Sequence, residues 1–187
     1  MADTTWDEKY NSQDFDCSKE PAFFLKKQIH RLSRGKALDV AMGTGRNSIF
    51  LAKHGYAVDG VDFSEVAIEK VNSFAQKDSL PIHLERADLT HYQIAEKNYD
   101  LIINFYFLER ALFPMMEKGL KKNGMLLFET YTVEQARYGR PRNPDYLLRP
   151  NELLKSFHNL NIIYYHERLE QEGDETKAIA SMLAQKG

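Results

Sequence analysis

The feature that most constrains this chain is a glycine-containing turn between a short apolar run and a helical pattern. Residues 37–48 read ALDVAMGTGRNS. Residues 37–40 predict a buried strand, and residues 46–54, which Gly55 follows, predict a helix. Gly43 and Gly45 let the backbone turn sharply and let a ligand approach closely. Because open parallel sheets bind ligands at the carboxyl ends of their strands, the turn predicts a ligand site.

Strands and helices alternate along the chain around this turn. The predicted strands are short apolar runs at residues 37–40, 56–61, 81–84, 99–105, 125–128, 162–165 and 178–183. Alternation up to about residue 130 is typical of a parallel sheet with helices on both faces, and the last two runs predict a closing antiparallel hairpin. We therefore predict an α/β fold with a Rossmann-like doubly wound sheet, seven-stranded and mostly parallel, with an antiparallel C-terminal strand.

The 187 residues suit one domain. Residues 1–33 are predicted to be an N-terminal cap segment followed by a helix. Residues 131–150 are polar, aromatic and basic and contain three prolines. A stretch of that length without regular structure is usually a functional loop, so we predict a lid insertion there.

Composition narrows the functional class. The single cysteine, Cys17, excludes an internal disulfide bond. The acidic N-terminus is unlike a targeting peptide, and no run of apolar residues is long enough to span a membrane. A net charge of −2 disfavours nucleic acid as a partner. The six histidines form no ligand pair, so no metal site is predicted. We expect a cytoplasmic protein that acts on a small molecule.

Two acids flank the turn and distinguish between cofactors. Asp62 ends the second predicted strand, where a carboxylate can accept both hydroxyls of an adenosine ribose. A dinucleotide such as NAD would also fit the glycines, but Ser48 replaces the third glycine of its fingerprint. Asp39 would oppose a pyrophosphate and attract the cationic S-adenosylmethionine (SAM). The residues therefore favour SAM over NAD.

The segment LDVAMGTGRNSIFLAKHGYAVDGVDFS resembles motifs I and II of the class I SAM-dependent methyltransferases. Its second part is similar to the tellurite-resistance (TehB-like) branch and its small-molecule relatives. The resemblance extends from about residue 6 to residue 168. It is specific for SAM, whose product is S-adenosylhomocysteine, and much less so for the acceptor.

The resemblance implies a role for each matching residue. Asp39 would lie near the methionine part of SAM, Asp62 would hold the ribose, and the turn would lie under the cofactor. The matching positions around these parts are Tyr10 in the N-terminal segment, Gly43, Gly45 and Arg46 in the turn, Phe63, Ala87, Asp88 and Leu89 near adenine, and Asn104 and Phe105 near the methyl group.

One residue departs from the family pattern. Ala41 stands where the family usually has glycine. If the backbone there adopts a positive φ, the methyl group of Ala41 strains the turn.

Candidate acceptor-side residues follow the fourth and fifth predicted strands. Tyr106 and Tyr131 could take a proton from the acceptor, or could simply pack in the core. Arg140 and Arg149, in the predicted lid, could draw in an anionic acceptor. The same segment could also be an RNA-facing patch or a solvated loop. Strand four ends in NFYF and not in the Asp/Asn-Pro-Pro-Tyr/Phe pattern of methyltransferases that act on the amino groups of adenine or glutamine. This difference argues against those acceptors.

The predicted function is SAM-dependent methyl transfer to a small, soft or anionic acceptor, such as a thiol or a chalcogen oxyanion. The alternatives are a non-catalytic module that binds SAM or S-adenosylhomocysteine, and a methyltransferase that acts on RNA or protein.

Overall fold

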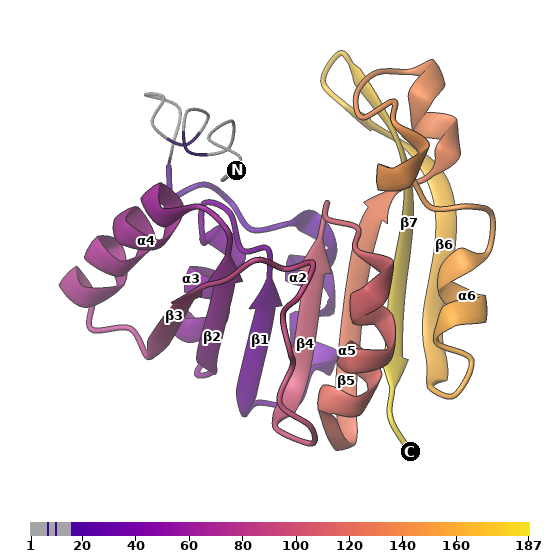
Figure 1. Cartoon of the computed structure of the whole chain (residues 1–187). Helices are drawn as coiled ribbons and strands as arrows, with labels where there is room; N and C mark the ends of the chain where they lie inside the picture. The colour runs from indigo at the N-terminus through magenta and orange to yellow at the C-terminus, as the bar shows by residue number, and fades with distance from the viewer. Residues whose placement is uncertain (1–6, 8–9, 11–15) are drawn as a thin grey trace.

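Seven strands form one sheet in the order β3-β2-β1-β4-β5-β7-β6 (Figure 1). The computed structural model describes residues 7, 10 and 16–187, except the side chain of residue 172. The strands are β1 (Lys36–Val40), β2 (Ala57–Asp62), β3 (Ile82–Arg86), β4 (Tyr99–Phe105), β5 (Leu120–Tyr131), β6 (Asn161–Glu172) and β7 (Glu175–Gln185). Strands β1 to β5 pair in parallel, and β7 pairs antiparallel with both β5 and β6. The predicted α/β fold and its antiparallel C-terminal strand are confirmed.

Helices cover both faces of the sheet. The α-helices are α2 (Phe23–Gln28), α3 (Arg46–Lys53), α4 (Glu65–Lys77), α5 (Phe113–Gly119) and α6 (Glu152–Ser156). Short 3₁₀ helices are η1 (Ile29–Arg31), η2 (Arg110–Leu112), η3 (Val133–Arg137) and η4 (Pro144–Tyr146). Figure 1 shows α5 and α6 on the side of the sheet nearer the viewer, with α2 and α3 behind it.

The alternation of side chains along β1 divides the core in two. Leu38 and Val40 pack with α5 and α6, whereas Ala37 packs with α2 and α3. Burial of both faces explains why β1 and β4 are nearly continuous apolar runs. These strands form the rigid base on which the loops at their carboxyl ends are held.

The C-terminal hairpin is longer than the apolar pattern indicates. Residues 166–177 continue β6 and β7 to a turn at Gly173, whose φ is +59°. Here the hairpin extends past the carboxyl end of the sheet (Figure 1), so its side chains are mostly polar. Sequence periodicity marks only the part that is buried against the sheet.

The segment of residues 131–150 packs against this hairpin. The Thr132 N–H donates to the Ala178 carbonyl at 2.9 Å. The buried side chain of Gln135 accepts from the Ala178 N–H at 2.8 Å and donates to the Arg140 carbonyl at 3.2 Å. Gln135 therefore takes the place of a strand partner where β5 has ended.

The N-terminal segment reaches the sheet through α3. Helix α2, which begins at Phe23, is the helix expected within residues 1–33. The Asn47 side chain on α3 accepts from the Ala22 N–H at 2.9 Å and is buried. Most of the first part of the predicted cap, residues 1–15, lies outside the described residues.

The turn after β1 adopts a left-handed backbone at three positions. The φ angle is +55° at Ala41, +56° at Gly43 and +70° at Gly45. A Cβ atom on Gly45 would lie 2.6 Å from the Val71 side chain on α4, so this glycine also permits close helix packing. Ala41 has the positive φ at which its methyl group strains the turn.

Ala41→Gly is therefore expected to stabilise the protein. A left-handed residue with a side chain costs roughly 1–2 kcal/mol, and the greater chain entropy of glycine offsets part of the gain. We expect the free energy of unfolding in urea to rise by about 0.5–1 kcal/mol. Ala75→Gly, in the last turn of α4, is the control and should lower stability. A less stable Ala41→Gly variant would contradict the strain.

Candidate functional site

A cavity of about 410 Å³ opens at the carboxyl ends of β1, β2 and β4. Its wall is formed by the glycine turn, the ends of the neighbouring strands and the N-terminal segment. The lining residues are Tyr10, Lys19, Ala41, Met42, Gly43, Thr44, Arg46, Asn47, Asp62, Phe63, Leu89, Phe105, Tyr106 and Phe107. Eight predicted site residues are therefore brought together: Tyr10, Ala41, Gly43, Arg46, Asp62, Phe63, Leu89 and Phe105, with Tyr106 beside them.

The Asp62 carboxylate fixes the geometry of this cavity. Its Oδ2 accepts from the Gly43 N–H at 2.8 Å, and its Oδ1 accepts from the Ser64 N–H at 2.9 Å. Burial raises the pKa of Asp62, while these hydrogen bonds act to lower it. Each carboxylate oxygen can accept more than one hydrogen bond, so Asp62 can hold the turn and still accept from a ligand.

Asp39 lies behind the turn and is not among the residues that line the cavity. It is 1% exposed and accepts from the Ser48 hydroxyl at 2.6 Å. Burial raises its pKa from 3.8 to about 7, against the lowering effect of the Ser48 hydrogen bond. Asp39 therefore acts on the cavity through its charge and not through direct contact.

Basic and aromatic groups close the cavity from the N-terminal side. The Tyr10 hydroxyl oxygen lies 3.0 Å from the position that a Cβ on Gly43 would take. The Arg46 guanidinium donates to the Glu20 carbonyl at 3.3 Å. Lys19, which the sequence interpretation did not single out, also lines the wall.

Besides Asp39, four predicted cofactor residues lie outside the lining. Gly45 supports the turn, and Ala87 packs against the core. The exposed Asp88 carboxylate accepts from the Thr90 N–H at 2.9 Å and the Thr90 hydroxyl at 2.7 Å. Asn104 is fully buried; its Nδ2 donates to the Phe107 carbonyl at 2.8 Å, and its Oδ1 takes no hydrogen bond from any described residue.

Tyr106 stands between this cavity and a second one. Its φ is +56°, an unusual conformation for a bulky residue. Its ring centroid lies 5.2 Å from that of Tyr131 and 5.7 Å from the Lys177 Nζ. Tyr131 and Lys177 line the second cavity, which is about 340 Å³ and is completed by Gln135, Tyr138, Gly139, Arg140, Asp174, Glu175 and Thr176. The two predicted residues Tyr131 and Arg140 are thus brought together beside Tyr106.

A buried carboxylate adjoins Tyr106 that the sequence interpretation missed. Glu129 on β5 is 2% exposed. Its Oε1 accepts from the Tyr106 hydroxyl at 3.2 Å, and its backbone carbonyl accepts from the Tyr106 N–H at 2.8 Å. An acidic residue inside the apolar run MLLFETY was the sequence signal that could have identified it.

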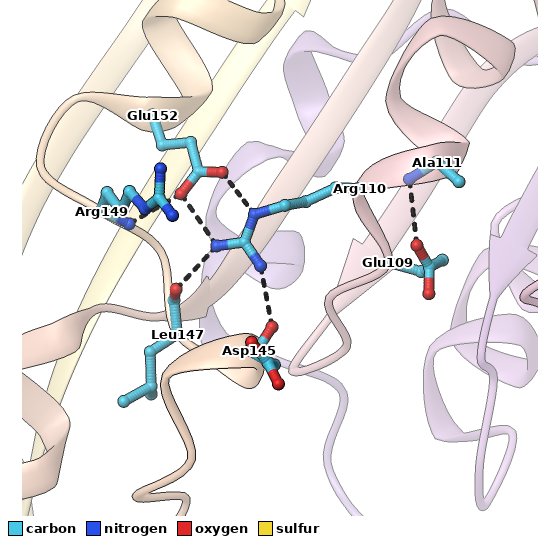
Figure 2. Close-up of polar contacts among 7 residues, drawn as sticks. All are labelled: Glu109, Arg110, Ala111, Asp145, Leu147, Arg149 and Glu152. Atoms are coloured by element: carbon cyan, nitrogen blue, oxygen red, sulfur yellow. Dashed lines mark hydrogen bonds and ion pairs between the residues drawn. The ribbon is translucent and has the colours of Figure 1, made fainter.

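Arg149 lines neither cavity. It belongs to a polar cluster around Arg110, which joins η2 to the end of the 131–150 segment (Figure 2). The Arg110 guanidinium donates to the Asp145 carbonyl at 2.8 Å, to the Leu147 carbonyl at 2.9 Å and to the Glu152 carboxylate at 2.6 Å. The Arg149 N–H donates to the same carboxylate at 2.7 Å. This cluster fixes the C-terminal part of the segment to the body of the protein.

The described part of the chain has neither a cluster of metal-ligating side chains nor a helix that could span a membrane. No group of three or more His, Cys, Asp or Glu side chains there could hold a metal ion. No helix among those residues has the length and apolar character needed to cross a membrane.

Known proteins share this sequence and this architecture. The family model for tellurite resistance protein TehB matches residues 4–178. A protein of Haemophilus influenzae described as a probable S-adenosyl-L-methionine-dependent methyltransferase, TehB, is 28% identical over 92% of this chain and 68% of its own. The crystal structure of TehB from that organism superposes with a TM-score of 0.79 at 23% identity, covering 100% of this chain and 67% of that one.

A ubiquinone biosynthesis O-methyltransferase of Coxiella burnetii is 32% identical, over 70% of this chain and 64% of its own. The TehB model spans nearly the whole chain, including the glycine turn, Asp39 and Asp62. The chain therefore belongs to the TehB family and is a class I SAM-dependent methyltransferase.

Proposed function

We propose that this enzyme transfers the methyl group of SAM to a small acceptor that binds beside Tyr106. The observation that carries the proposal is the position of Asp62, in the cavity wall directly beside a glycine turn. A carboxylate there suits the two hydroxyls of a ribose. The buried Asp39 adds a negative charge next to the same turn, which suits a cationic cofactor.

The lining residues fit the parts of SAM. Phe63 and Leu89 offer apolar surface to adenine, with Ala87 and Asp88 at the edge of that region. Arg46 and Lys19 supply positive charge for the carboxylate of the methionine part. Asp39, which lies behind the turn, supplies negative charge for the ammonium group of the same part, and the Asn104 Oδ1, which takes no hydrogen bond from any described residue, is a further acceptor at the end of β4. When bound, SAM supplies the electrophilic methyl group.

The acceptor fits best in the second cavity. Tyr131 gives it aromatic surface, and its lining holds the cations Arg140 and Lys177 as well as the acids Asp174 and Glu175. We propose a thiol or a chalcogen oxyanion as the acceptor class, with the two cations as the groups that would contact an anion. The Coxiella relative is named as an O-methyltransferase, which supports a hydroxyl as a further candidate acceptor. The 131–150 segment forms one wall, and we propose that it acts as a lid that keeps water from the reacting atoms.

Methyl transfer depends mainly on the alignment of the acceptor with the methyl group and needs few catalytic residues. Methyl transfer from a sulfonium is an in-line displacement, so the enzyme must hold the nucleophile and the methyl group close together and exclude water. Tyr106 lies where the two cavities adjoin and is the residue proposed to contact the nucleophile.

Asp62→Ala is expected to weaken SAM binding by about 1–3 kcal/mol, because charge-assisted hydrogen bonds to the ribose are lost. Calorimetric titration with SAM measures the change. Asp62→Asn, which keeps the shape of the side chain but removes its charge, tests whether SAM binding needs that charge. Asp59→Ala, on the same strand but outside the lining, is the matched control. Unchanged affinity in Asp62→Ala would show that the ribose is held elsewhere.

Formation of S-adenosylhomocysteine with a panel of thiols, phenols, selenite, tellurite, RNA and protein tests the acceptor class. We expect turnover with a small thiol or oxyanion and none with the macromolecules. Turnover with RNA or protein would favour the alternative acceptors. SAM binding without transfer to any acceptor would favour a non-catalytic module.

Asp39→Asn should change both stability and binding. Because the folded pKa of about 7 lies above 3.8, Asp39 lowers stability progressively as pH rises from about 4 to about 7. The neutral asparagine avoids this loss, so the ligand-free variant should be at least about 1 kcal/mol more stable than wild type at pH 8 and similar at pH 4. The same variant should bind SAM about tenfold more weakly. A variant less stable at pH 8 would contradict the account.

Arg110→Ala should loosen the lid without emptying the cofactor cavity. Loss of the guanidinium leaves the Asp145 and Leu147 carbonyls without that donor. We expect faster amide hydrogen exchange in residues 143–150 and a raised acceptor KM, with SAM affinity within about twofold of wild type. Arg137→Ala, whose pair with Glu134 is solvent-exposed, is the control. Unaltered exchange would contradict a structural clamp.

A further inference from the structure

The buried carboxylate of Glu129 is held from two sides in a way that leaves one oxygen for Tyr106. Its Oε2 accepts from the Ser181 hydroxyl on β7 at 2.5 Å, and the Arg168 guanidinium on β6 lies 3.4 Å away. Arg168 also donates to the Ser181 hydroxyl at 2.5 Å. The remaining oxygen, Oε1, accepts from the Tyr106 hydroxyl at 3.2 Å. The cluster thus orients one acidic oxygen toward the cavity wall.

Sheet register explains how these distant residues meet. Glu129 on β5 pairs directly with Ser181 on β7, and Arg168 lies two residues from the β6 partner of Ser181. The backbone adds a further constraint, because the Tyr106 N–H donates to the Glu129 carbonyl at 2.8 Å. Tyr106 is therefore tied to the same glutamate by main chain and side chain, in a left-handed conformation that such a residue rarely adopts.

We propose that Tyr106 and Glu129 form a proton-accepting pair, so that the acceptor is a thiol or hydroxyl that enters the site with its proton still bound. This inference rests on the proposed function and specifies its acceptor. Tyr106 lines the cofactor cavity, whereas Glu129 is buried and reaches the cavity through the Tyr106 hydroxyl. Tyr106 is therefore the catalytic residue, and Glu129 acts through it as a positioning and proton-holding residue.

The proton transfer balances as follows. The acceptor sulfur or oxygen forms a bond to the methyl carbon as the bond between that carbon and the sulfonium sulfur breaks, and the electron pair remains on the sulfur of S-adenosylhomocysteine. The acceptor proton passes to the Tyr106 oxygen, and the Tyr106 proton passes to Glu129 Oε1. The pair ends with a neutral tyrosine and a protonated glutamic acid, which later releases its proton to solvent.

The charges around the pair suit this role. Burial raises the pKa of Glu129, while Ser181 and Arg168 lower it and the neighbouring Glu170 raises it. Burial, Glu129 and Tyr131 raise the pKa of Tyr106, whereas Arg46 lowers it. Lys177, on β7, lies over the Tyr106 ring. Tyr106 therefore stays protonated on its own, and a carboxylate of raised pKa is a suitable final acceptor for the proton.

A preionised acceptor would need no such pair, and this difference provides the test. Steady-state formation of S-adenosylhomocysteine is measured at pH 7 with 2-mercaptoethanol and phenol, which are protonated there, and with 4-nitrothiophenol and pentafluorophenol, which are ionised. Glu129→Gln and Tyr106→Phe should each lower kcat by about 100-fold on the protonated probes and by less than about threefold on the ionised ones. The double variant should lose little more than either single one, because the two act as a unit.

The pH profile provides a second readout that a structural role would not move. In wild type, kcat with 2-mercaptoethanol should fall below the pKa of Glu129, because the carboxylate must be ionised to accept the proton. In Glu129→Gln that inflection should disappear, and kcat should follow the ionisation of the thiol alone. Glu170→Gln, which removes another carboxylate that contacts Arg168, is the matched control: it should keep the inflection, moved to lower pH because Glu170 no longer raises the pKa of Glu129.

Folding and cofactor binding are checked by the Tm and the SAM affinity of every variant. Tyr106→Phe removes only a hydroxyl, so it tests the proposal even if Glu129→Gln does not fold. Equal losses on protonated and ionised probes, or no loss on either, would overturn the proposal. Turnover with selenite or tellurite but with no thiol or phenol would overturn it and leave the proposed function standing. Absence of turnover with every acceptor would overturn both.

Discussion

The hydrogen bond from the Gly43 N–H to the Asp62 carboxylate is the contact on which the cofactor site depends. It joins the turn after β1 to the end of β2, and the second oxygen of the same carboxylate accepts from Ser64, the N-cap residue of α4. One side chain thereby sets the shape of the turn and the start of a helix, and it is the group that we propose accepts from the ribose. The strained backbone at Ala41 and the close packing of Gly45 on Val71 are retained around it.

Electrostatics makes the same site favour a cationic ligand over an anionic one. Asp39 and Asp62 are both largely buried, and burial raises the pKa of each, so the ligand-free protein carries an unfavourable concentration of acid near the turn. A cationic cofactor relieves that cost, whereas a pyrophosphate would add to it. The buried carboxylate of Glu129 is stabilised by protein groups. Arg168 and Ser181 contact one of its oxygens, and the other accepts from the Tyr106 hydroxyl. In the proposed function, the two acids near the turn and Glu129 mark a cofactor half and an acceptor half of the site.

Sequence predicts the parts of this molecule that are encoded locally. The turn, Asp39 and Asp62 lie within 26 residues of one another, and spacing alone relates them to the strand ends. The positive φ of Ala41 could likewise be anticipated from the family's usual glycine. An acid inside an apolar run singles out Glu129, but its partners could not be predicted, because they arise from pairing with Ser181, 52 residues away, and from the register of β7 against β6. The place of Arg149 depends on Glu152, which also binds Arg110, so an arginine pattern by itself could not predict that Arg149 lies outside the lining of both cavities.

The most direct measurement of the central claim is a crystal structure of the protein with S-adenosylhomocysteine. The account predicts that both ribose hydroxyls lie within hydrogen-bonding distance of the Asp62 carboxylate, with adenine against Phe63 and Leu89 and the sulfur directed toward Tyr106. A nucleoside bound away from Asp62, or lodged in the cavity between the 131–150 segment and the hairpin, would contradict it.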